Sequence, residues 1–147
     1  MKKNINQIIV NQKKIIFLLI GFSLLIRLIS LYFFHDTKID NEWNILLNNL
    51  VNFRSYSIFK FDDLLIPSAL LPPLYAFFLY LVKILTFNKL NFLFSALLIQ
   101  VIISSISVYI FFKINEKFFE KKTSVISSII FSLIPLNIYS SGQISSV

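Results

Sequence analysis

The stretch that decides the fold is IIFLLIGFSLLIRLISLYFF, residues 15–34. It holds a single charged residue, Arg27, and an α-helix of about 20 residues crosses the ~30 Å hydrocarbon core of a bilayer. Lys13 and Lys14 precede it, and positive residues mark the cytoplasmic end of a span. The stretch is too long for a secretory signal, and no small-residue cleavage site follows it. We therefore expect a retained transmembrane helix with a cytoplasmic N-terminus.

The composition of the whole chain agrees with a membrane protein. Of its 147 residues, 56% are hydrophobic and 14% are charged, which leaves too few polar side chains to coat a water-soluble globule. The net charge of +7 lies in short clusters beside apolar runs, as in chains that are oriented in bilayers, and no nucleic-acid recognition motif accompanies it. We expect no nucleic-acid partner. Because the chain has no cysteine, disulfides and thiolate metal sites are excluded.

Two further apolar stretches have the length of a span, residues 90–112 and 123–140. Four lysines lie between or at the ends of these stretches, and the positive-inside rule places that loop in the cytoplasm. If the proline-interrupted stretch 64–87 also spanned, the lysines would lie outside. We therefore expect 64–87 to form a helix at the outer interface, and the chain to cross the membrane three times.

The outer loop, residues 35–89, contains a second helical pattern. Apolar residues recur there at i, i+3, i+4, i+7 and i+8, with asparagines on the opposite side. The apolar residues are Trp43, Leu46, Leu47, Leu50 and Val51. This pattern predicts an amphipathic helix on the membrane surface, with Trp43 at headgroup depth. The predicted fold is an all-α, multi-pass integral protein of the inner (plasma) membrane. Residues 1–147 are expected to form the N-terminal part of a membrane domain, with about three transmembrane helices and two juxtamembrane interfacial helices in the first outer loop.

Two carboxylates in this loop are candidate catalytic residues. Asp40 and Glu42 stand at the head of the amphipathic helix, just outside the membrane. Asp40 can cap that helix and Glu42 can complement its dipole. A carboxylate that is partly desolvated at the lipid–water boundary can also act as a general base on an acceptor hydroxyl. Asp36, Asp40 and Glu42 together could bind a divalent metal ion through their carboxylates, although the sequence does not require a cofactor.

Two arginines are candidates for binding a lipid phosphate. Arg27 lies inside the first span, where a charge needs an anionic partner or a route to water. It can snorkel to the outer headgroups or bind a phosphate there. Arg54 can do the same from the loop. Gln100, Ser104 and Ser105 in the second span are typical of hydrogen bonding between helices.

The order of these features resembles the start of the dolichyl- or polyprenyl-phosphate-sugar glycosyltransferases, the GT-C class that includes protein O-mannosyltransferases and aminoarabinose lipid A transferases. The resemblance covers the whole chain. It rests on Arg27, Asp40-Asn41-Glu42-Trp43, Ser55-Tyr56-Ser57, Pro72-Pro73-Leu74-Tyr75, Gln100 with Ser104-Ser105, and Pro135.

The resemblance implies a membrane glycosyltransferase, of which this chain is expected to be the front part. It implies Asp40 as catalytic base, with Glu42 as the near alternative, and Arg27 or Arg54 as the cation that stabilises a leaving phosphate. The partners would be a polyprenyl-phosphate-linked sugar, a lipid, glycan or protein acceptor, and membrane lipid. The reaction would invert the anomeric centre at the outer face of the membrane. The alternative is a small non-enzymatic accessory or assembly protein whose helices only pack.

Overall fold

The computed structural model describes residues 2–39, 42–61, 64–67, 71–86 and 91–144. The chain divides into two compact units. Unit 1 comprises Met1–His35 and Leu98–Gly142, and unit 2 comprises Asp36–Leu97 and Gln143–Val147. The helix α4 (Phe92–Asn115) begins in unit 2 and continues into unit 1.

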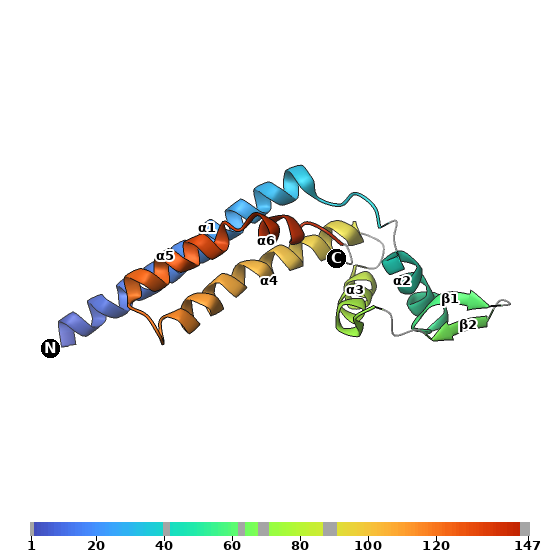
Figure 1. Ribbon diagram of the computed structural model, residues 1–147, viewed down its shortest axis with the longest axis horizontal. Helices are drawn as coiled ribbons and strands as arrows, with labels where there is room; N and C mark the ends of the chain where they lie inside the picture. The colour runs from blue at the N-terminus through green and yellow to red at the C-terminus, as the bar shows by residue number, and fades with distance from the viewer. Residues whose placement is uncertain (1, 40–41, 62–63, 68–70, 87–90, 145–147) are drawn as a thin grey trace. The chain divides into compact units, whose positions relative to one another are not determined.

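Unit 1 is built from helices. α1 (Lys2–Phe34) is the longest, and α5 (Lys121–Ser132) and α6 (Pro135–Ser140) lie along it (Figure 1). Among the residues that the structure describes, two helices are long enough and apolar enough to cross a membrane, over Lys14–Phe34 and Phe92–Asn115. Only 28% and 33% of these segments are buried, whereas the core helix of a soluble protein is mostly buried. The first two predicted spans, 15–34 and 90–112, therefore correspond to helices of the expected length and polarity.

The third predicted span, 123–140, is not one continuous helix. It is divided into α5 and α6, with Leu133 and Ile134 between them. Pro135 is the physical reason, because proline cannot donate the helical hydrogen bond and disfavours helical geometry in the residue before it. Ile134 accordingly has an extended backbone, with φ −61° and ψ 117°. Each piece alone is too short to cross a bilayer.

Serines form the buried face of α5. Ser124, Ser128 and Ser132 recur every four residues, so they share one side of the helix, and all three are fully buried. The Ser128 hydroxyl donates to the Ser124 carbonyl at 2.7 Å, which satisfies it within the helix. Small side chains with internally satisfied hydroxyls allow helix backbones to approach closely in an apolar solvent.

Unit 2 contains two helices in the predicted outer loop, but the second helix, expected over 64–87, begins only at Pro73. They are α2 (Glu42–Phe53) and α3 (Pro73–Leu85), and α3 is too short to be a span. Between them in the sequence is an antiparallel hairpin of β1 (Ser57–Phe61) and β2 (Leu64–Pro67), which the all-α prediction did not include (Figure 1).

The apolar face of α2 is covered by protein. Trp43, Leu46, Leu47 and Leu50 are buried as their spacing predicts, while Val51 at the edge of the face is exposed. α2 packs on α3 and β1, and the rings of Trp43 and Tyr75 meet edge to face with centroids 4.8 Å apart. Trp43 is 3% exposed, so it is a core residue of unit 2 and does not stand on the surface at headgroup depth as predicted.

Candidate functional site

Of the two candidate acids, Glu42 lies at the beginning of α2, and Asp40 lies outside the described residues. Glu42 is the first residue of α2, and its side chain is exposed. A carboxylate in the first turn of a helix interacts favourably with the positive end of the helix dipole. Glu42 therefore has the position that its helix-stabilising role requires, and its exposed carboxylate is accessible to an acceptor hydroxyl.

Asp36 accepts a hydrogen bond from the last described residue of the chain. Its Oδ2 accepts a 2.6 Å hydrogen bond from the backbone N–H of Ile144, a buried residue of the same unit. In the described part of the chain, no three histidine, aspartate or glutamate residues lie close enough to hold a metal ion. The carboxylate set Asp36, Asp40 and Glu42 includes an undescribed residue, so a metal there stays a prediction.

Arg54 stands at the other end of α2 from Glu42. The two residues are separated by the whole helix, or about 18 Å at 1.5 Å per residue. Arg54 has a φ of 54°, the left-handed conformation in which many helices end, and the Ser55 N–H donates to the Asn49 carbonyl at 3.3 Å. Its side chain is exposed. Arg54 can therefore reach a soluble or lipid-borne anion, but it does not pair with Glu42.

Arg27 is buried in unit 1, with 1% of its surface exposed. Its Nε donates to Oγ of Ser104 on α4 at 2.8 Å, and its Nη1 donates to both the carbonyl and the hydroxyl of Ser23. Its Nη2 is buried and has no hydrogen-bond partner among the described residues. Ser104, which the sequence analysis assigned to hydrogen bonding between helices, thus accepts a hydrogen bond from the Arg27 guanidinium.

The direction of the Arg27 side chain differs from the snorkelling interpretation. Ser23 lies one turn before Arg27, so the guanidinium points back toward the N-terminus of α1. Side chains on a helix tilt in this direction. The predicted outer end of the span is at Phe34, and Arg27 therefore points away from the outer headgroups and toward the middle of the span.

Lys83, which the sequence analysis did not name as a site residue, forms a polar link between α3 and α2. The Nζ of Lys83 on α3 donates to Oδ1 of Asn48 on α2 at 3.0 Å, and Asn48 in turn donates to Asn44 at 3.2 Å. Lys83 also lies over the ring of Phe92, 5.9 Å from its centroid. Burial against these groups lowers the pKa of Lys83. The feature of the sequence that could have identified this site is a lysine within an otherwise apolar helix.

Two hydrogen bonds hold the hairpin to the helices of unit 2. The buried Asn49 donates from Nδ2 to the Ser57 carbonyl at 2.9 Å, which links α2 to the start of β1. The Tyr56 hydroxyl donates to the Leu71 carbonyl at 2.7 Å, which links the two ends of the hairpin segment. Burial raises the pKa of Tyr56, so this hydroxyl remains a donor at neutral pH.

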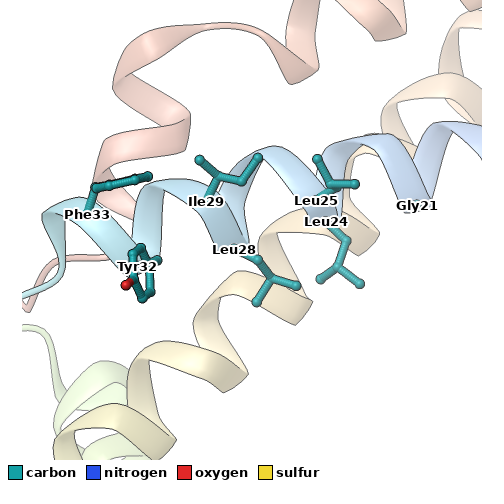
Figure 2. Close-up of a pocket in the computed structure, with 7 residues that line it drawn as sticks. All are labelled: Gly21, Leu24, Leu25, Leu28, Ile29, Tyr32 and Phe33. Carbon is teal, nitrogen blue, oxygen red and sulfur yellow. The ribbon is translucent and has the colours of Figure 1, made fainter.

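An apolar hollow of about 490 Å³ lies along α1 (Figure 2). Its lining comes entirely from this helix: Gly21, Leu24, Leu25, Leu28, Ile29, Tyr32 and Phe33. A Cβ placed on Gly21 would meet no atom within 4 Å, so the missing side chain leaves open space.

Comparisons with protein-family models, with characterised proteins and with solved structures find no match to this chain.

Proposed function

We propose that this chain forms part of a membrane glycosyltransferase that transfers a sugar from a polyprenyl-phosphate donor to an acceptor at the outer face of the inner membrane. The observation that carries the proposal is the pair of carboxylates, Asp40 and Glu42, at the head of α2 shortly after a helix that can span the membrane. This placement puts an acid where a lipid-borne donor and a water-borne acceptor can meet.

The proposed reaction is a single displacement. Asp40 removes the proton of the acceptor hydroxyl, whose oxygen then bonds to the anomeric carbon of the sugar. The bond from that carbon to the phosphate oxygen breaks on the opposite face, so configuration inverts and polyprenyl phosphate leaves with the bonding electrons. Glu42 is the alternative base, since it is exposed and only two positions further along the chain.

A cation is needed to stabilise the leaving phosphate. Arg54 is exposed and free to approach a headgroup, whereas Arg27 is buried and engaged by Ser23 and Ser104. Arg27 could take the role only through its Nη2, and only if a rearrangement opened that buried group to the donor. We therefore assign the phosphate contact to Arg54 in the first place.

The proposed topology has a cytoplasmic N-terminus and three crossings, with the broken segment 123–140 as the third. Prolines are tolerated in membrane helices when neighbouring helices and serine side chains satisfy the freed backbone groups. The buried serines of α5 and its packing along α1 support this assignment. The hollow on α1 supplies an apolar surface for the polyprenyl chain of the donor.

A second candidate function is a non-enzymatic accessory or assembly protein. It is favoured by the burial of Arg27 and of the α5 serines, which shows that much of the polar chemistry of unit 1 serves helix packing. The two functions are separated by assaying sugar transfer from a polyprenyl-phosphate donor by the full-length protein in membranes. Transfer that depends on Asp40 or Glu42 supports the enzyme, and transfer-free membranes with normal expression support the accessory role.

A further inference from the structure

One face of the β1–β2 hairpin is entirely apolar and exposed. Phe59 is paired with Ile66 across the hairpin, and Phe61 is paired with Leu64. Residues that are opposite in an antiparallel pair share a face, and so do alternate residues of one strand. The four side chains therefore form one surface, which we call the hairpin face. Their exposed fractions are 55%, 46%, 67% and 72% in the order named.

The other side of the hairpin is already occupied. Ile58 is buried, and Asn49 of α2 bonds to the backbone and hydroxyl of Ser57. A two-stranded hairpin is marginally stable in water unless it packs against something. Here the packing on α2 supplies one side, and the hairpin face still presents two phenylalanines and two aliphatic side chains that need an apolar environment.

The location of the hairpin indicates which apolar environment this is. Unit 2 contains not only the hairpin but also the beginning of α4, from Phe92 to Leu97, and α4 is one of the two helices that can span a membrane. The unit therefore includes the point at which the chain enters the bilayer. A mixture of phenylalanine, leucine and isoleucine on one face is typical of elements that lie in the interface plane.

We propose that the hairpin face lies on the bilayer surface that α4 enters, with its four side chains among the lipid acyl chains. The four side chains lie side by side on one face of the hairpin, so this face can rest flat on the bilayer surface. Over residues 54–67, Arg54 and Lys60 balance Asp62 and Asp63. The contact is consequently apolar and does not depend on anionic lipid.

The test uses the full chain, which has no cysteine of its own, reconstituted into phosphatidylcholine vesicles with and without phosphatidylglycerol. Single variants Phe59→Cys, Phe61→Cys and Ile66→Cys carry an environment-sensitive fluorophore. Asn52→Cys, on an exposed position of α2, is the matched control. Positions on both strands keep the test decisive if one variant fails to fold, which circular dichroism of each sample reports.

The expected result is blue-shifted emission at the hairpin positions, strong quenching by nitroxides near the headgroup end of the acyl chains, and loss of quenching by aqueous iodide. The control position should show the reverse, and phosphatidylglycerol or salt should change neither pattern. Equal iodide quenching at the hairpin and control positions would overturn the proposal. So would protection from both quenchers, which would mean that a second copy or another protein segment covers the face, and so would insertion that requires phosphatidylglycerol.

Discussion

The guanidinium Nε of Arg27 donates a 2.8 Å hydrogen bond to Oγ of Ser104, a residue 77 positions later on another helix. The bond joins the two helices that are able to span a membrane. The buried positive charge is thus solvated by hydroxyl and carbonyl oxygens, from Ser104 and Ser23. Such a polar link specifies which helices pair, because the alternative is an unsatisfied charge in hydrocarbon.

Removal of the Ser104 hydroxyl should destabilise unit 1. Ser104→Ala leaves the Arg27 Nε without its acceptor, and we expect a loss of about 1–2 kcal/mol in the free energy of unfolding. In an Arg27→Met background the same change should cost almost nothing, because no donor remains. Denaturant unfolding in detergent micelles measures both. Ser107→Ala is the control, since Ser107 bonds to a carbonyl of its own helix. Equal cost in both backgrounds would contradict the link.

Arg54 offers a test that separates backbone strain from phosphate binding. Because Arg54 holds a φ of 54°, Arg54→Gly should raise the free energy of unfolding by about 0.5–1 kcal/mol. The same variant should lose sugar transfer if Arg54 contacts the leaving phosphate. Arg54→Lys keeps both the charge and the strain, so it should match the wild type in stability and retain part of the transfer. Full transfer by the glycine variant would remove Arg54 from the site.

Lys83 should make stability depend on alkaline pH. Burial lowers its pKa in the folded protein below the usual 10.5, so the unfolded chain binds more protons between the two values, and stability rises with pH across that window. Tyr56 acts in the opposite sense, because its pKa is raised on folding and stability falls once the unfolded chain ionises first.

Comparison of the wild type with Lys83→Met isolates the lysine. The stability advantage of the methionine variant should be largest below the folded pKa of Lys83 and should shrink as the pH approaches 10.5. Thermal unfolding at a series of pH values measures this difference. A difference that grows with pH would show that Lys83 is stabilised as a cation, contrary to its burial.

Sequence patterns accounted for some elements better than for others. The spacing of Trp43, Leu46, Leu47 and Leu50 predicted α2 and its buried face, but it could not say whether lipid or protein would cover that face. The hairpin was not predicted, because residues 57–63 fell in the charged loop segment and residues 64–67 fell in the interfacial helix that we expected over 64–87. An Asp-Asp pair between two short β-branched and aromatic runs was the signal for a turn.

The sequence placed Arg27 inside the first span, but its partner could not be predicted, and the snorkelling interpretation overlooked the direction in which helical side chains tilt. Helical side chains tilt toward the N-terminus, and this rule alone gives the direction of its side chain. Which helix supplies the acceptor depends on long-range packing, and Ser104 was one of several serines in α4 that could have met it. The break before Pro135, in contrast, follows from local chemistry.

The proposed topology places Lys117 in the cytoplasm and Asn52 outside. Both residues are exposed in the structure, so cysteine at either position is accessible to reagent wherever the membrane permits. In intact cells, an impermeant thiol reagent should label Asn52→Cys and should label Lys117→Cys only after the cells are opened. Ser57 is unsuitable as a probe because it is fully buried. Labelling of Lys117→Cys in intact cells would contradict three crossings.

The central claim is tested most directly by sugar transfer from a polyprenyl-phosphate donor in membranes that contain Asp40→Asn or Glu42→Gln in the full-length protein. Asparagine remains a good helix cap, so Asp40→Asn should preserve expression and stability. As the general base, Asp40 should contribute ~10²–10⁴ in rate, and we expect at least about a hundredfold loss of transfer. A loss confined to Glu42→Gln would move the base to Glu42 within the same mechanism. Wild-type transfer by both variants at normal expression would contradict the proposed function.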